Sequence, residues 1–118
     1  IILELHRSGA GLLLGSDAPQ VFNVPGFSIH RELGALVAAG LTPYEALRTG
    51  TVAVAEFLNS NTGVVAEGKQ ADLILLNANP LLDISNGKRI HGVMLQGRWL
   101  PRGELDARLA RYVVQDRK

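Results

Sequence analysis

The stretch that decides the fold is Gly11–Pro19, which reads GLLLGSDAP. Three leucines between two glycines form a short, continuous apolar run, which is typical of a strand buried on both faces in a parallel sheet. The turn that follows carries Asp17, and catalytic groups of parallel α/β folds lie where such strands end. We therefore predict a buried strand over residues 11–16, with Asp17 at its carboxyl end.

Two roles fit this aspartate. A carboxylate held on a rigid element can ligate a divalent cation or accept a proton from water. Alternatively, an aspartate before Ala-Pro simply opens a turn, because its side chain bonds to nearby backbone amides. The residues of the stretch favour the turn and leave the catalytic role open.

Helical patterns flank the stretch on both sides. Residues 1–8, IILELHRS, have the apolar spacing of a helix that ends before Gly9. After an irregular loop, SIHRELGALVAAG repeats apolar residues on one helical face, with Ser28 as the candidate N-cap and Gly40 as the stop. The buried strand is thus expected between two helices.

The next helix start is marked by the sequence TPYE at Thr42–Glu45. It offers a threonine N-cap, a proline at the first helical position and a glutamate three residues after the cap, which together form a capping box. We predict a helix from here to about Leu58, broken near Gly50, where a second short helix capped by Thr51 begins.

Beyond residue 62 the apolar period changes from helical to strand-like. A turn-rich connector, NPLLDISNG, interrupts this part, and a strand pair is joined around Gly97. The tail from Gly103 is helical in pattern. The predicted strands are GVVAEG at 63–68, ADLILLN at 71–77, IHGVMLQG at 90–97 and RWL at 98–100.

Composition excludes several classes of function. The 118 residues carry 12 Lys and Arg against 11 Asp and Glu, so a nucleic-acid partner is not expected. There is no cysteine, and the longest apolar runs, such as LILL at 73–76, are far shorter than the roughly 20 residues of a membrane span. No signal peptide is recognisable, which favours the cytoplasm over secretion.

Because the chain begins with Ile1 and its one methionine is Met94, we expect a fragment of a longer protein.

His30 is the second candidate for the site. It lies at the start of a predicted helix near the Asp17 loop, where an imidazole could donate a hydrogen bond to a substrate carbonyl or carboxylate. A surface or capping histidine is the commoner fate of such a residue, and His6 and His91 fit structural roles. Zinc needs three or four protein ligands, which these residues do not supply. If Asp17 is a metal ligand, its partners lie elsewhere.

Several stretches together resemble the C-terminal part of metal-dependent amidohydrolases, especially the branch related to imidazolonepropionases and prolidase-like peptidases. The resemblance covers about residues 5–102. Where the family usually has threonine before the aspartate, this chain has Ser16, which keeps a hydroxyl. The stretches are GLLLGSDAP, HRELGALVAAGLTPYEALRTGTVAVAEFL, TGVVAEGKQADLILLNANPLLDI and IHGVMLQGRWL.

The resemblance implies an α/β fold in three parts. Residues 1–62 would be the final strand and helices of a (β/α)8 barrel, with GLLLGS as its eighth strand. Residues 63–100 would be the C-terminal strands of a small β-sandwich domain, and residues 101–118 a C-terminal helix. A barrel of this type takes about 250 residues, so this chain would hold only a part of one.

The resemblance also implies a site and a reaction. Asp17 would bind a divalent metal, with zinc expected, and would serve as the general base that passes a proton from water to the leaving nitrogen. His30 would lie near bound substrate. The reaction would be hydrolysis of an amide-type C–N bond in a small peptide-like or cyclic amide substrate. The family's remaining ligands, a His-x-His pair, a bridging Lys or Glu and two further histidines, are not in this sequence, so we expect the chain by itself to be inactive and to hold no metal.

A second hypothesis is a free-standing structural or interaction domain derived from such an enzyme. An interior strand without its neighbours would expose apolar surface and unpaired edges, which favour association. We therefore expect a homo-oligomer. A third hypothesis, a small unrelated α/β binding domain, is disfavoured by the density of matching stretches. An upstream reading frame with a His-x-His pair would separate the first hypothesis from the second.

Overall fold

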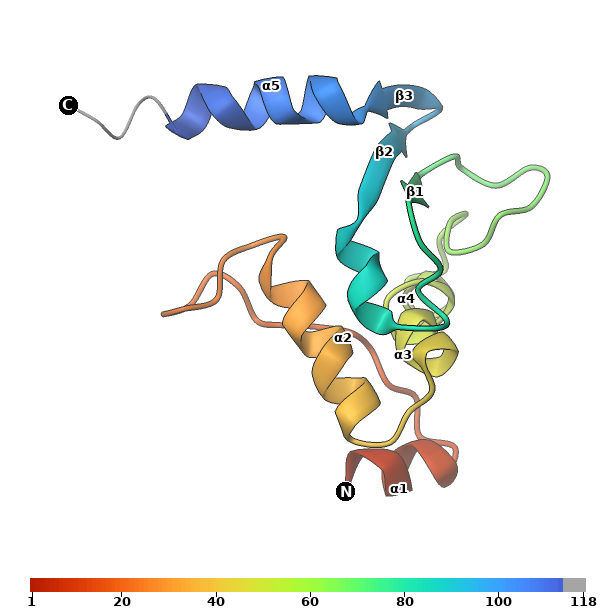
Figure 1. Cartoon of the computed structure of the whole chain (residues 1–118). Helices are drawn as coiled ribbons and strands as arrows, with labels where there is room; N and C mark the ends of the chain where they lie inside the picture. Colours follow the sequence, from red (N-terminus) through yellow and green to blue (C-terminus); the bar gives the residue numbers. More distant parts are fainter. Residues whose placement is uncertain (114–118) are drawn as a thin grey trace.

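A computed structural model describes residues 1–113 of the chain. The chain is α/β: four helices come first along the chain, and an antiparallel sheet follows them. The last helix extends away from the rest of the molecule (Figure 1). The elements are α1 (Ile2–Arg7), α2 (Ser28–Ala38), α3 (Pro43–Thr49), α4 (Val52–Phe57), β1 (Leu73–Leu76), the 3₁₀ helix η1 (Ile84–Lys88), β2 (Ile90–Leu95), β3 (Arg98–Pro101) and α5 (Arg102–Val113).

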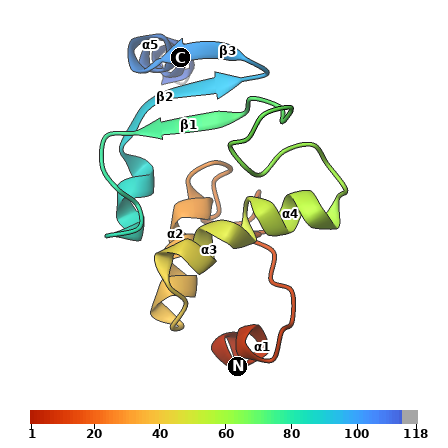
Figure 2. The ribbon, with the colours of Figure 1, turned by 90° about the vertical axis from the view of Figure 1, so that its right-hand side faces the viewer.

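The helices and the sheet form layers. The sheet lies on one side of α2, α3 and α4, and α1 lies on the other (Figure 2). The core between the helices consists of Leu33, Leu36, Leu41 and Ala46. Ile84 of η1 packs against this core and so connects the helices to the strand-rich half of the chain.

The sheet has the strand order β1-β2-β3, and both pairs are antiparallel. The predicted hairpin around Gly97 is confirmed. Gln96 and Gly97 have φ angles of 50° and 79°, which is the pair of positive values that a tight two-residue hairpin turn requires. Trp99 of β3 pairs with Met94 of β2, and its ring lies over Gly92, where a side chain would collide with it.

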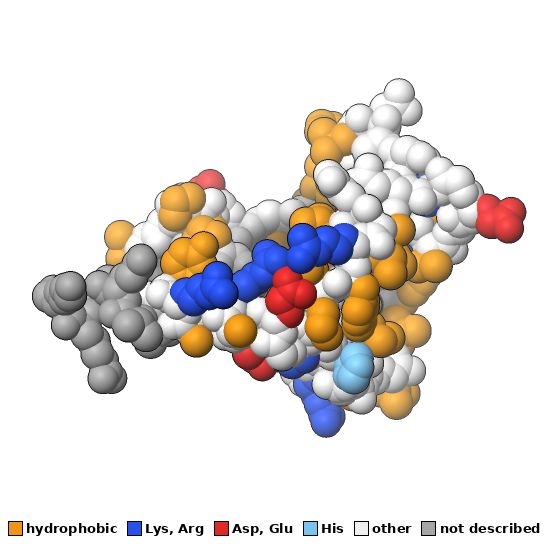
Figure 3. Space-filling model, turned by 90° about the horizontal axis from the view of Figure 1, so that it is seen from above, with side chains coloured by type: hydrophobic (Ala, Val, Ile, Leu, Met, Phe, Trp, Pro, Cys, Tyr) orange, Lys and Arg blue, Asp and Glu red, His pale blue; other side chains and the backbone are white. Residues whose placement is uncertain are grey.

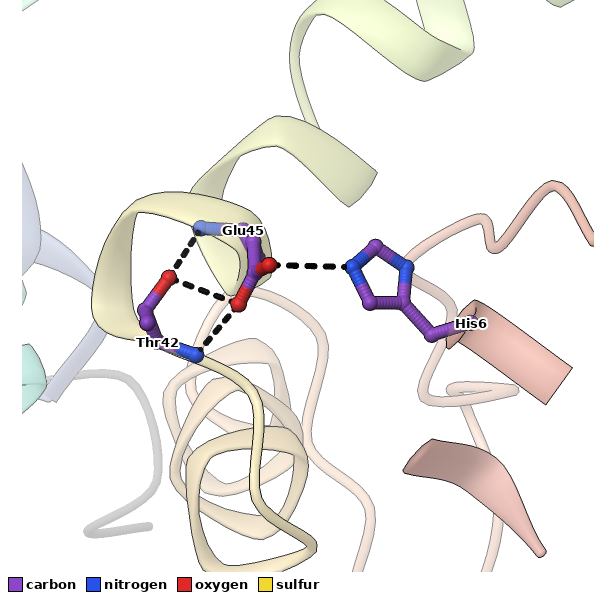
Figure 4. Close-up of polar contacts among 3 residues, drawn as sticks. All are labelled: His6, Thr42 and Glu45. Carbon is purple, nitrogen blue, oxygen red and sulfur yellow. Dashed lines mark hydrogen bonds and ion pairs between the residues drawn. The ribbon is translucent and has the colours of Figure 1, made fainter. Parts of the chain in front are cut away.

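The predicted capping box of α3 is also confirmed (Figure 4). The Thr42 hydroxyl accepts a hydrogen bond from the Glu45 backbone N–H, and Glu45 Oε2 accepts one from the Thr42 backbone N–H at 2.7 Å. His6 Nε2 of α1 lies 3.2 Å from the other carboxylate oxygen of Glu45. The cap therefore also joins α1 to α3.

Two predicted strands are wrong. Residues 11–16 and residues 63–68 belong to no strand of this structure. A strand requires a hydrogen-bonded neighbour along its length, and within residues 1–113 neither segment has one. Leu14 N–H instead donates to the Thr49 carbonyl of α3 at 3.0 Å. The apolar pattern was satisfied by packing without a ladder of hydrogen bonds.

One predicted helix cap is wrong, and a second is confirmed in position but makes no side-chain capping bond. Phe27, not Ser28, precedes α2, and Ser28 is already helical. The Ser28 hydroxyl is engaged by Ser16 rather than by its own helix. Thr51 precedes α4 as predicted, but its hydroxyl donates backward to the Leu47 carbonyl at 2.9 Å. The Ser28 hydroxyl thus joins two segments, and the Thr51 hydroxyl binds a carbonyl in the last turn of α3.

The predicted C-terminal helix is present as α5, and residues 114–118 lie outside the described part. Ion pairs run along its surface: Glu104 accepts from both Arg98 and Arg108, and Arg102 pairs with Asp106 at 2.8 Å. From above, a row of basic side chains with an acidic group among them follows this helix (Figure 3). No helix within residues 1–113 is long and apolar enough to cross a bilayer.

Candidate functional site

The extended segment before Asp17 alternates between two faces. Leu12 and Leu14 pack against the helical core. Leu13 between them is 47% exposed, and the side chain of Asp17 is exposed as well. This period of two is that of a strand with one face on the helices and the other face open. The segment thus has the side-chain alternation of the predicted strand although it lacks strand partners.

Asp17 itself occupies a left-handed backbone conformation, with φ of 51°. This region is uncommon for residues other than glycine, although aspartate is enriched there. Its Oδ2 atom accepts a hydrogen bond from the Gln20 side chain. The turn hypothesis expected bonds to backbone amides, and the partner is a side-chain amide instead.

The residue before Asp17 is held by a polar network. Ser16 Oγ lies 2.7 Å from Ser28 Oγ at the start of α2. The Ser16 carbonyl accepts a hydrogen bond from Asn23 Nδ2 at 3.0 Å, and the Arg31 guanidinium of α2 donates to Asn23 Oδ1. These hydrogen bonds therefore tie the middle of the loop and the start of α2 to Ser16, the residue at which the loop begins.

His30 lies in different surroundings. It lines a cavity of about 480 Å³ together with apolar residues of α2, α3 and β1, among them Leu33, Leu47 and Leu76. Its Nδ1 atom is buried and has no hydrogen-bond partner among residues 1–113. Burial, together with the positive charge of Lys88, holds the pKa of His30 below its usual value, which favours the neutral imidazole.

The two sequence candidates are not brought into one pocket, because Asp17 is absent from the residues that line the His30 cavity. Within residues 1–113 no group of three or more His, Asp or Glu side chains is arranged to hold a metal ion. Asp17 offers one hard oxygen donor, which suits a divalent cation but does not complete a site. The described residues alone therefore do not fit a bound zinc.

Sequence reasoning missed the Ser16–Ser28 pair and the Asn23–Arg31 link. Ser28 was interpreted as an N-cap because serine at a helix start is typical of that role. The sequence offers only a weak signal for the other role of Ser28. A second hydroxyl residue, Ser16, lies twelve residues earlier, directly before the aspartate. Two hydroxyls at such a separation meet only once the loop is folded.

The sequence model of the amidohydrolase family matches residues 1–100. The chain belongs to the amidohydrolase family. Members of this family are generally metal-dependent. A comparison with curated protein sequences gave no significant match.

Solved amidohydrolase structures share the fold of the chain. An Xaa-Pro dipeptidase is 25% identical over 85% of this chain and 24% of its own, with a TM-score of 0.75. A Bifidobacterium longum protein assigned as a prolidase is 35% identical over 93% of this chain and 29% of its own, with a TM-score of 0.77. Molinate hydrolase is 26% identical over 84% of this chain and 25% of its own, with a TM-score of 0.71.

The chain thus spans about a quarter of the length of these solved relatives. The names of two of these relatives describe hydrolases, an Xaa-Pro dipeptidase and molinate hydrolase.

Proposed function

We propose that this chain is the C-terminal portion of a metal-dependent hydrolase that cleaves an amide-type C–N bond. In this proposal Asp17 is a metal ligand, with zinc the expected ion, and also the general base. Because the chain offers a single ligand, the remaining ligands would come from outside residues 1–118, and the chain by itself would be inactive.

The alternation of residues 12–17 carries the proposal. Leu12 and Leu14 face the helices, whereas Leu13 and Asp17 face away from them. In a (β/α)8 barrel each strand has helices on its outer side and the interior on the other, and reactions occur at the carboxyl ends of the strands. A segment at 11–16 that served as the eighth strand would direct Asp17 toward that interior at the required end.

The chemistry of Asp17 follows from its group. An amide nitrogen leaves readily only after it is protonated, so hydrolysis needs a group that takes a proton from water and later gives one to nitrogen. An ionised carboxylate on a fixed turn can do both. A solved relative is named for its action on Xaa-Pro dipeptides, which supports a small peptide-like substrate here. A cyclic amide is the alternative substrate in this proposal, and His30 is its substrate-binding residue.

The proposal divides the chain as the sequence suggests. Residues 1–62 would complete the barrel, residues 63–100 would supply strands to a small β-sandwich, and residues 101–118 would form a C-terminal helix. The contact between Ile84 and the helical core would then pack the two larger parts against each other.

The first measurement is the DNA sequence upstream of the Ile1 codon. An in-frame extension that encodes a His-x-His pair supports the hydrolase, and Asp17→Asn is then made in the full-length enzyme. We expect kcat to fall by about 10²–10⁴ with little change in KM, since the base is lost and the shape is kept.

Asp83→Asn is the matched control. Asp83 is an exposed aspartate whose carboxylate accepts a hydrogen bond from the Ser85 backbone N–H at 2.8 Å, so its role is that of a turn. If Asp17→Asn keeps wild-type turnover and behaves as Asp83→Asn does, the catalytic role of Asp17 is refuted.

A second candidate, an interaction domain that acts as a homo-oligomer, is favoured by the exposed edge of the sheet. Within the described residues β1 pairs only with β2, and Ile74 on it is 61% exposed, with Val65 nearby in sequence 86% exposed. Open apolar edges promote association. A start codon directly before Ile1, together with a dimer in sedimentation analysis, would support this candidate over the hydrolase.

A further inference from the structure

The first turn of α2 holds the residue before Asp17 by two separate routes. The direct route is the 2.7 Å contact between the hydroxyls of Ser28 and Ser16. The second route runs from Arg31 to the Asn23 side chain, whose Nδ2 donates to the Ser16 carbonyl at 3.0 Å. One route fixes the side chain of Ser16 and the other fixes its backbone, so the peptide that leads into Asp17 is held on both sides.

The two routes differ in their surroundings. Ser28 is 7% exposed and is one of two buried polar residues in the described part of the chain, with Thr49. Arg31 is exposed. A hydrogen bond shielded from water resists exchange with solvent, and its loss leaves a buried hydroxyl without a partner. The Ser28 hydroxyl therefore needs its partner Ser16, whereas the Arg31 end of the second route is open to water.

Asp17 needs such support because of its backbone. A residue other than glycine with φ of 51° persists only where the surrounding structure fixes it. In the described part of the chain, its side chain bonds to Gln20 alone, in the same exposed turn. Two links attach this turn to α2. Ser16, which is adjacent to Asp17, bonds directly to Ser28, whereas Gln20 is bridged to Asn23 and through it to Arg31.

We propose that Ser28 is the positioning residue of Asp17: its buried hydroxyl fixes Ser16, and through Ser16 the left-handed conformation that aims the Asp17 carboxylate away from the helices. The effect on catalysis rests on the proposed function, whereas the effect on geometry does not. A group that supports a reacting residue from behind changes activity by about 10–100-fold when it is removed.

The test uses the ¹⁵N-labelled 118-residue chain and solution NMR. Ser28→Ala and Ser16→Ala each remove one hydroxyl of the pair. We expect both variants to shift the Asp17 and Gln20 amide resonances in the same way and to lower the order parameter of Asp17. The double variant is expected to add nothing to either single change, because both remove one interaction. Ser16→Thr keeps a hydroxyl at this position and is expected to preserve the wild-type signals.

Thr49→Val is the matched control. Thr49 is buried like Ser28, but its hydroxyl donates only to the carbonyl of its own helix, Ala46, at 2.7 Å. We expect this variant to lose stability while the Asp17 signals stay in place. Asp17 resonances that are unchanged in Ser28→Ala, or changed equally in Thr49→Val, would overturn the inference.

In the full-length enzyme, Ser28→Ala is expected to lower kcat about tenfold and to leave KM unchanged. The two proposals fail separately. If Asp17→Asn keeps full turnover while Ser28→Ala still disturbs the Asp17 signals, the proposed function is wrong and the positioning role stands. If Asp17→Asn abolishes turnover while Ser28→Ala changes neither kcat nor the NMR signals, the positioning role is wrong.

Discussion

Gly50→Ala should destabilise the chain because the Asp17 segment packs directly on this glycine. A Cβ atom at Gly50 would lie 2.6 Å from Leu14 Cδ2 and 3.2 Å from Leu14 Cβ. The δ-methyl could rotate away, but the Leu14 Cβ is fixed to a backbone whose N–H is bound to the Thr49 carbonyl. The segment must therefore move away from α3.

The expected magnitude combines two opposing effects. Overpacking of a well-filled site costs about 1–3 kcal/mol. Alanine offsets about 0.4–1 kcal/mol of this by reducing the freedom of the unfolded chain, and the φ of −103° at Gly50 adds no penalty for a side chain. We expect the free energy of unfolding to fall by about 1–2 kcal/mol, measured by urea denaturation followed by circular dichroism at 222 nm.

Gly34→Ala is the matched control. Gly34 lies inside α2, and a Cβ atom there would meet nothing within 4 Å. Alanine should raise stability at this position by about 0.5–1 kcal/mol, since glycine is unfavourable in a helix interior. Because Leu14→Ala keeps the Leu14 Cβ, the 3.2 Å contact remains, so Gly50→Ala should still destabilise the chain in a Leu14→Ala background. A Gly50→Ala chain as stable as wild type would refute the close packing of the Asp17 segment on α3.

Two further predictions concern the cap of α3. Thr42→Ala should lower the free energy of unfolding by about 1 kcal/mol in a urea titration, because the Thr42 hydroxyl loses its hydrogen bonds with the Glu45 backbone N–H and Glu45 Oε2; an unchanged midpoint would contradict this. The pKa of Glu45 is lowered from 4.5 to about 2 by hydrogen bonds from the Thr42 backbone, the Thr42 hydroxyl and His6. A carboxyl whose pKa falls on folding stabilises the fold above pH 4.5 and loses this effect as the pH falls toward 2. The stability advantage of wild type over Glu45→Gln, measured by urea denaturation from pH 6 to pH 2, should therefore shrink across this window, and a constant difference would rule out the shift.

Local signals in the sequence predicted the helices and the hairpin well. The capping box depends on residues three apart, and the hairpin turn depends on a glycine that accepts a positive φ, so both are fixed by neighbours in sequence. The structure confirms the box at Thr42 and Glu45 and the turn at Gly97. Family membership could likewise be predicted, because it rests on long matching stretches.

The two strands that do not form and the Ser28 cap depend on distant partners. Val64 and Val65 have strand-forming side chains, but a strand forms only against another strand, and the sequence does not say which one is available. The same applies to the leucines of residues 12–14. Ser28 was assigned to its own helix because a cap is a local contact, whereas its partner Ser16 lies twelve residues away. Asp17 as a site residue and His30 as a substrate-binding residue remain predictions.

The position of the single tryptophan determines what fluorescence can report about this chain. Trp99 lies within the β2–β3 hairpin, with its ring over Gly92, whereas most of the circular dichroism signal at 222 nm comes from the helices. Fluorescence thus monitors the sheet, and circular dichroism monitors the helices, of which α5 lies against β2 and β3 while α1–α4 lie below the sheet. Coincident unfolding curves would mean that the Ile84 contact couples helices and sheet into one cooperative unit. Separate curves would mean that the two layers unfold independently, and that the sheet needs a larger assembly to share the stability of the helices.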